Sequence, residues 1–466
     1  MSGFSTLALI LISAALVAGG NGLSLTLTSV GGISAGYDAT LIGLMGTAYY
    51  SGQFISAFVI PPMFKYSGHI RIFAGLASCG AISLMVMALS DSPIMWAAMR
   101  VVAGVAVGGI AMTIESWMMG AVTPGKRGRL MSIYRIADLG SITGVQFLLP
   151  IFGTTGANIF IINAMLFSLA LVPLALSRLI NPPAPEVAMV TPGWLWKLSP
   201  VAITGVAVVA LVNGAFRTVG PLYAEAIGLG AAGIASFISA AILAGAIFQY
   251  PLGWYSDRGD RRNVLLFATA GAGIASITMS FVSAEWALIA VFFFGGFAMP
   301  LYPLSVAHAY DFAKPEDYIR LSAGFILVFS AMAAIGPLIA AGLINMFGPH
   351  VFFIYTGVLH LFFIAFVVAR MRVRDAVPVF LRQRFVALMR NSPMIGHFVN
   401  RGDDKTADSE VMADTMPAGA DQAGWSPDMP DRRQGPRRES DRLSPEGQGG
   451  RRASDQPGPV TEGDGG

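Results

Sequence analysis

Residues 253–262 read Gly253-Trp-Tyr-Ser-Asp257-Arg258-Gly-Asp260-Arg261-Arg262 and separate two long apolar runs, at 231–254 and 263–283. A short charged segment between runs of about 20 apolar residues is typical of a loop that joins two membrane-spanning helices. The chain repeats this alternation of apolar runs and polar loops from its start to about residue 371.

The distribution of charge excludes a water-soluble protein. The chain has 466 residues, of which 54% are hydrophobic and 12% charged, whereas soluble domains carry about 25% charged residues. Residues 1–371 hold 16 Lys and Arg and 12 Asp and Glu, and the last 95 residues hold 14 and 15. The first 371 residues lack the polar groups to cover a soluble surface. We therefore exclude a soluble enzyme and a nucleic-acid binder, and predict a polytopic membrane protein whose partner is the lipid bilayer.

Twelve apolar runs are long enough to cross a bilayer as helices. We predict an all-α membrane protein with spans near 6–29, 40–62, 71–90, 93–119, 131–153, 158–179, 199–222, 231–254, 263–283, 286–308, 320–343 and 350–370.

The loops between these spans differ in charge. One alternating set carries nearly all the Lys and Arg between the spans, from Lys65 and Arg71 to Arg370. The other set, near 30–39, 91–92, 154–157, 223–230, 284–285 and 344–349, carries none. Because basic loops stay in the cytoplasm, we expect both termini there, in a multi-pass protein of the cell inner membrane.

An internal repeat divides the membrane part into halves. An ungapped offset of 192 residues superposes six spans on six, and aligns Asn21-Gly22 with Asn213-Gly214, Gly36 with Gly228, and Gly156 with Gly348. Two such halves with a shared interface are typical of a rocking transporter. We predict two pseudo-symmetric six-helix bundles, 1–180 and 199–371, joined by a cytoplasmic linker at 181–198.

The end of the chain is expected to lie outside the membrane. Residues 372–400 combine apolar and basic side chains, a pattern that fits either an amphipathic helix on the membrane surface or a solvated helix. Residues 401–466 are rich in Gly, Pro, Asp and Arg, which predicts a disordered cytoplasmic tail.

The loop at 253–262 resembles a cytoplasmic signature of the major facilitator superfamily, Gly-x-x-x-Asp-Arg-x-Gly-Arg-Arg. Gly253, Asp257, Arg258, Arg261 and Arg262 match it, and Asp260 replaces its second glycine. In that family the charged groups of this loop hold the two halves together in one access state. The loop after the second span keeps Gly68 and Arg71 but has Lys65 where the family has Asp.

Span 4 carries a second resemblance. Arg100-Val-Val-Ala-Gly104-Val-Ala106 is similar to the family pattern Arg-x-x-x-Gly-x-Gly/Ala, and Ile-Glu115-Ser-Trp117 resembles a bacterial, largely uncharacterised branch. The resemblance covers about residues 5–371. It implies the twelve-helix facilitator fold and secondary transport.

Two arginines in the spans need an explanation, since a charge at the bilayer centre costs about 2.5–3.5 kcal/mol on insertion scales. Arg100 in span 4 is either a cavity cation, which binds an anionic substrate or tunes a proton carrier, or a structural cap on a neighbouring span. Arg217 in span 7 has the same two interpretations.

Uncharged polar residues extend the candidate substrate and coupling cavity. Polar side chains in spans bind either substrate or a neighbouring helix. The candidates are Asn21, Gln53, Gln146, Asn213 and Tyr302, of which Tyr302 precedes Pro303 in a span that could be broken.

Glu115, Arg135 and Asp138 form a predicted charge network in the cytoplasmic thirds of spans 4 and 5. Arg135 and Asp138 are three residues apart and share a helix face. The network is either a set of structural ion pairs, or Glu115 or Asp138 carries a proton.

No arrangement of residues indicates an enzyme, a cofactor or a metal site, and Cys79 is the single cysteine. We predict a monomeric secondary transporter of a small polar or amphiphilic solute, driven by a proton or other ion gradient. The alternative is a facilitator-fold sensor or scaffold that acts through its tail.

Overall fold

The computed structural model describes residues 3–121, 124–154, 156–175, 191–314 and 317–374. These residues form helices and turns and contain no strand. The tail at 401–466, and residues 375–400 of the predicted amphipathic segment, lie outside this range.

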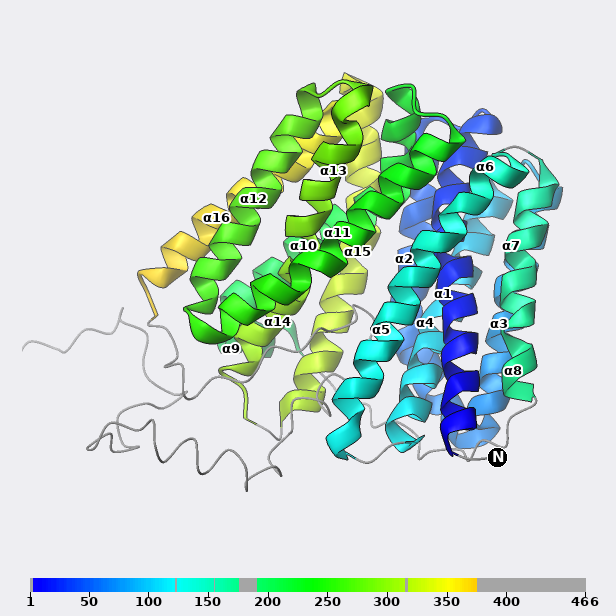
Figure 1. The fold of residues 1–466 in the computed structure, drawn as a ribbon, viewed down its shortest axis with the longest axis horizontal. Helices are drawn as coiled ribbons and strands as arrows, with labels where there is room; N and C mark the ends of the chain where they lie inside the picture. The colour runs from blue at the N-terminus through cyan, green and yellow to red at the C-terminus, as the bar shows by residue number, and fades with distance from the viewer. Residues whose placement is uncertain (1–2, 122–123, 155, 176–190, 315–316, 375–466) are drawn as a thin grey trace, which may run out of the picture.

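The N-terminal half contains the first six predicted spans, drawn from blue to cyan-green in Figure 1. Its elements are α1 (Gly3–Ser34), α2 (Ala39–Ser67), α3 (His69–Leu89), α4 (Pro93–Ala121), α5 (Pro124–Val145), the 3₁₀ turn η1 (Gln146–Leu148), α6 (Leu149–Phe152), α7 (Ala157–Leu169) and α8 (Leu171–Ala175).

The C-terminal half is drawn in green to orange and begins after a short helix, α9 (Pro192–Leu198). Its elements are α10 (Pro200–Ala226), α11 (Ala231–Arg258), α12 (Arg261–Phe281), α13 (Ala284–Ala298), α14 (Leu301–Tyr310), α15 (Tyr318–Phe347) and α16 (Val351–Met371).

Every predicted span coincides, over its described residues, with one helix or with two or three consecutive helical elements. Ten helical segments of the described residues are long and apolar enough to cross a membrane. The other two predicted spans are α2 and the α5–η1–α6 segment. α2 is more polar, with Tyr49, Tyr50 and Gln53, but its 29 residues extend about 43 Å at 1.5 Å per residue. α5 begins with the basic segment 124–129 and passes into the 3₁₀ turn at Gln146.

The two halves pack their helices in the same way. In the N-terminal half α2 packs on α4, α1 on α5, and α3 on α7. The helices 192 residues later repeat these pairs, as α11 with α13, α10 with α15, and α12 with α16. Turn glycines repeat too: Gly36 and Gly228 have φ of 79° and 88°, and Gly156 and Gly348 have 82° and 86°. Glycine adopts positive φ without steric cost, so the aligned glycines make equivalent turns.

The halves meet at one end of the bundle. We call the side on which α1 begins the proximal side and the side on which it ends the distal side. Asn345 of α15 donates to the Asp38 carboxylate (3.0 Å) and to Thr40 (2.6 Å) at the distal end of α2. Deeper in the bundle, Thr47 donates to the Ala334 carbonyl at 2.7 Å, and Ser29 donates to the Thr218 carbonyl.

The described hydrogen bonds between the halves lie towards the distal side, where α5 and α11 also meet (Figure 1). There Ser239 of α11 donates to the Thr143 carbonyl of α5 at 3.3 Å. The structure is therefore closed on its distal side.

Gly43 makes the distal closure possible. A Cβ atom at this position would lie 2.4 Å from the Ala341 Cβ and 2.8 Å from the Pro337 carbonyl oxygen of α15. Real side chains avoid such distances, so α2 and α15 approach this closely only because Gly43 has no side chain.

We expect Gly43→Ala to lower the unfolding free energy by about 1–3 kcal/mol, the usual cost of forcing atoms into a packed contact. Gly75→Ala in α3 is the matched control, because a Cβ there meets nothing within 4 Å and alanine favours the helix by about 1 kcal/mol. Thermal unfolding of the purified variants measures both. Equal stability of Gly43→Ala and the wild type would contradict the close contact.

Candidate functional site

A cavity lies between the two halves. α1, α2, α4 and α5 contribute most of its wall, and α10, α11, Met299 and α15 contribute the rest. Its volume of about 130 Å³ is below the roughly 300–1,000 Å³ typical of pockets for drug-sized ligands. In this conformation it therefore has room only for a small solute.

Three of the seven predicted substrate and coupling residues line the cavity: Asn21, Gln53 and Arg217. The other four, Arg100, Gln146, Asn213 and Tyr302, are buried away from it. Gln146 and Asn213 have side-chain amides without a described hydrogen-bond partner. Tyr302 follows the break between α13 and α14, which lies before Pro303, and packs on Phe329, which lines the cavity.

The predicted charge network also lines the cavity. Glu115 is 1% exposed, and Arg135 pairs with Asp138 at 3.3 Å across one turn of α5. All three side chains belong to the N-terminal half and border the same cavity as Arg217 of the C-terminal half. The cavity therefore joins charges from both halves.

Arg217 differs from the other charged residues of the cavity. Its side chain makes no hydrogen bond or ion pair with any residue that the structure describes. It lies close enough to Arg135 for the two positive charges to repel each other. A cation held in this way attracts an anionic or strongly polar group into the cavity.

Arg100 is fully buried behind the cavity wall. Its guanidinium donates to the Ser24 hydroxyl at 2.6 Å and lies 4.5 Å from the centre of the Tyr49 ring. Tyr49 itself lines the cavity, so its ring stands between Arg100 and the space that a solute could occupy.

Tyr49 also organises two of the predicted polar residues. Its hydroxyl donates to the Asn21 side-chain oxygen at 2.7 Å and accepts from the Gln53 amide at 2.9 Å. Asn21, Tyr49 and Gln53 therefore form one chain of hydrogen bonds along the wall. Sequence analysis did not single out Tyr49, although its place four residues before Gln53 in a span puts both on one helix face.

Other aromatic side chains of the cavity were also missed. Tyr50, Tyr134 and Phe329 line it beside Met299. An aromatic residue in a span is usually packed in the core or in contact with lipid, so its type alone does not signal a cavity. The grouping of Tyr49 and Tyr50 with Gln53 in α2 was the available sign that this helix faces a cavity.

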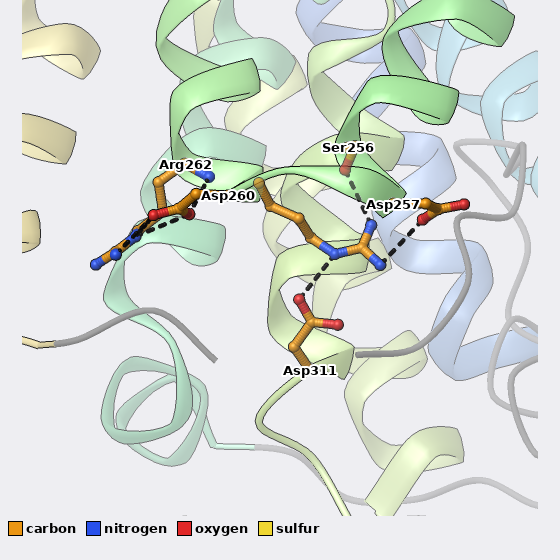
Figure 2. Close-up of polar contacts among 6 residues, drawn as sticks. Ser256, Asp257, Asp260, Arg262 and Asp311 are labelled. Atoms are coloured by element: carbon orange, nitrogen blue, oxygen red, sulfur yellow. Dashed lines mark hydrogen bonds and ion pairs between the residues drawn. The ribbon is translucent and has the colours of Figure 1, made fainter. Parts of the chain in front are cut away.

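The loop signature forms a separate cluster at the proximal end of the C-terminal half (Figure 2). Arg261 is 1% exposed and donates to the Asp311 carboxylate at 2.8 Å and to the Ser256 hydroxyl at 3.0 Å, and it pairs with Asp257 at 3.3 Å. Ser256, Asp257 and Asp311 all belong to the C-terminal half. The described contacts thus tie the ends of α11, α12 and α14 to one another.

Asp260, which stands where the signature has its second glycine, caps the start of α12. Its side chain accepts from the backbone N–H of Arg262 at 2.9 Å, as the N-cap of α12. The same carboxylate pairs with the Arg262 guanidinium at 2.8 Å. Arg258 instead lies over the Trp254 ring at 3.9 Å, while Gly253 is buried in α11.

Comparison with known proteins shows what the chain is similar to. A family model of the Major Facilitator Superfamily matches residues 202–402. A transporter of Escherichia coli O7:K1 (strain IAI39 / ExPEC), the uncharacterized MFS-type transporter YcaD, is 25% identical over 321 residues, which are 67% of this chain and 82% of that protein. The YcaD protein of Shigella flexneri matches to the same extent. The C-terminal half of this chain therefore matches the Major Facilitator Superfamily model, and about two thirds of the chain is similar to MFS-type transporters.

Solved structures show the same facilitator fold. The nucleoside transporter NupG has a TM-score of 0.65 at 13% identity and covers 80% of this chain and 100% of its own. A bacterial homologue of the human lysosomal transporter Spinster, in an inward-facing and occupied conformation, has a TM-score of 0.64 at 15% identity, covering 81% and 98%. The chain is thus a multi-pass membrane protein, and the curated proteins that it resembles are transporters, which are not enzymes.

The position of Tyr49 leads to a test of the cavity wall in this facilitator. We expect Tyr49→Leu to lower the melting temperature more than Tyr49→Phe, because phenylalanine keeps a ring beside Arg100. A desolvated cation–π contact is worth up to about 2 kcal/mol. Thermal unfolding in detergent compares the two variants, and an equal loss from both would show that the ring does not stabilise Arg100.

Proposed function

We propose that this facilitator is a secondary active transporter that moves a small polar or amphiphilic solute by alternating access, coupled to protons. The observation that carries the proposal is the cavity between the halves, where Arg217 of one half borders the same space as Glu115, Arg135 and Asp138 of the other. A site shared by both halves changes its exposure when the halves rock against each other.

Arg217 supports a solute with an anionic or hydrogen-bond-accepting group. A guanidinium offers five donors in a fixed plane, and no described residue accepts from Arg217. The chain of hydrogen bonds through Asn21, Tyr49 and Gln53 supplies further polar contacts. Phe329 and Met299 add apolar surface to the same cavity, and a cavity with both polar and apolar surface suits an amphiphilic molecule.

The carboxylates support proton coupling. Glu115 and Asp138 are side chains that take up and release protons, and both border the cavity in which Arg217 would hold the solute. Protonation of either carboxylate changes the charge around the solute, so the proton and the solute bind interdependently.

We further propose that the protein acts as a monomer in the cell inner membrane, with both termini and its proximal side in the cytoplasm. The excess of Lys and Arg in the proximal loops supports this orientation. With this orientation, the distal closure makes the described conformation inward-facing. The Arg261 cluster then lies on the cytoplasmic side, where its described contacts hold the ends of α11, α12 and α14 together.

Neutralising the cavity charges tests the transport mechanism. The assay uses proteoliposomes with a pH-sensitive dye inside, and solutes that drive proton movement through the wild type are selected first. We expect the same solutes to drive proton movement at least tenfold more slowly through Glu115→Gln and Arg217→Gln. Arg100→Gln should also lose flux, because Arg100 holds Tyr49 in the wall.

Glu285→Gln is the matched control, since Glu285 is exposed at the distal start of α13 and outside the cavity. All variants must first show wild-type amounts of folded protein. Wild-type flux through both Glu115→Gln and Arg217→Gln would refute the proposed roles of these residues.

Removing residues 401–466 separates transport from the alternative, a sensor or scaffold that acts through its tail. We expect the truncated protein to keep solute flux within twofold of the full chain, because the cavity and both halves lie before residue 375. Flux assays and a cellular phenotype are measured together. A phenotype that disappears on truncation, in a protein whose full chain shows no flux, would favour the scaffold.

A further inference from the structure

A second, smaller recess lies at the proximal end of the C-terminal half, away from the cavity between the halves. It has a volume of about 20 Å³, enough for about one water-sized atom. The ends of several helices converge on it. Its lining residues are Ser199, Pro200, Val201, Arg262, His308, Phe312, Arg370 and Arg374.

The recess is positively charged. Three of its lining residues are arginines, and Asp260 pairs with one of them, Arg262. Arg374 donates to the Leu198 carbonyl at 2.9 Å and lies over the Phe312 ring at 3.9 Å. The side chain of Arg370, one turn earlier in the chain, makes no hydrogen bond or ion pair with a residue that the structure describes. Its guanidinium is thus available to an anion.

A buried histidine faces the same recess. His308 is 7% exposed, and its ring contacts Phe312 at 5.2 Å. Neither ring nitrogen makes a hydrogen bond within the described part of the chain, and the side chain lines the recess. A polar group held in this way is costly unless a ligand or water satisfies it.

The N-terminus of α10 adds backbone donors. The Ser199 side chain accepts from the Ala202 N–H at 3.3 Å, and Pro200 has no N–H to offer. Val201 is therefore the first residue of the helix whose N–H remains for a ligand at the recess. The 27-residue helix also places the positive end of its dipole there, which favours an anion.

The surroundings place the recess at the membrane surface. α9 immediately precedes it and carries Trp194 and Trp196. Trp196 is 49% exposed, and the centre of its ring lies 6.0 Å from the centre of the Phe366 ring of α16. Tryptophan is enriched at the boundary between lipid tails and water, and basic pockets between helix ends at this depth suit lipid head groups.

We propose that this recess binds the phosphate of an anionic phospholipid. One phosphate oxygen enters beside His308 and the Val201 N–H, and the others accept from Arg370 and Arg374 at the mouth. The acyl chains remain in the bilayer beside α9 and α16. A bound lipid would then connect the ends of α10, α12 and α16, and so hold the proximal end of the C-terminal half at the membrane surface.

Native mass spectrometry of the full chain in neutral detergent tests the proposal. We expect dioleoyl-phosphatidylglycerol to bind more tightly than dioleoyl-phosphatidylcholine, which has the same chains but no net charge. Arg370→Gln should weaken phosphatidylglycerol about fivefold, since one Arg near a membrane surface is worth about 1 kcal/mol. Arg370→Lys should keep most of the affinity.

Arg372→Gln is the matched control. Arg372 lies two residues after Arg370, is exposed and does not line the recess. His308→Phe provides a second variant, which fills the recess without removing a fixed charge and should also weaken phosphatidylglycerol. Each variant must keep the wild-type melting temperature in detergent alone.

Two results would overturn the proposal. Equal effects of Arg370→Gln and Arg372→Gln, or equal binding of the two lipids, would show a general attraction of charge without a site. The soluble head-group analogue glycerol 1-phosphate distinguishes the source of the phosphate. If it binds as tightly as the lipid and depends equally on Arg370, the recess is a site for soluble phosphate esters and the lipid assignment is wrong.

Discussion

A charge inside a bilayer must find its compensation within the protein, and this constraint organises the membrane part of the structure. The spans contain few ionisable side chains, and most of them meet at the cavity between the halves. Arg135 pairs with Asp138, Glu115 borders the same space, and Arg217 faces it from the other half. The cavity therefore lies where the charged side chains of the spans meet. Lipid-facing surfaces stay apolar because the charged groups turn inward.

The same constraint explains the two kinds of arginine in the spans. Arg100 is held in the packed interior by the Ser24 hydroxyl and the face of Tyr49, and its Nε and Nη2 atoms have no hydrogen-bond partner among the described residues. Arg217 has no such partner among the described residues and borders a cavity instead. A fully packed cation stabilises one arrangement of helices, whereas a cation beside a cavity is available to a molecule that enters and leaves.

Much of the fold was predictable from the sequence. Apolar length determines which segments span the membrane, and the offset of 192 residues identified glycines that make equivalent turns, such as Gly36 and Gly228. The loop pattern at 253–262 pointed to the family. A break in the tenth span was expected at Pro303, but the helix is interrupted earlier, at Met299 and Pro300 between α13 and α14. Tyr302 lies beyond this break, packs in the core and does not line the cavity.

The candidate site was only half predictable, for a physical reason. A span that is apolar on every side carries no periodic signal of which face points inward. Arg100 and Arg217 therefore had the same interpretation from sequence, and only the rotation of α4 and α10 separates them. Tyr49 was missed because its role depends on contacts with Asn21 and Arg100, which lie on other helices. The N-cap role of Asp260 likewise became visible only in the turn that begins α12.

The chemistry of the distal contacts determines how easily the closed state can be reversed. The contacts described there are hydrogen bonds from hydroxyl and amide groups and a glycine contact, with no ion pair among the described residues. Each such bond contributes about 0.5–1.5 kcal/mol net, so the five described bonds between the halves are together comparable to the roughly 4 kcal/mol with which a millimolar ligand binds. Two conformations of nearly equal free energy are then within reach of one binding event. Closure of this kind is also insensitive to salt, so its balance would hold while the ionic strength on the distal side varies widely.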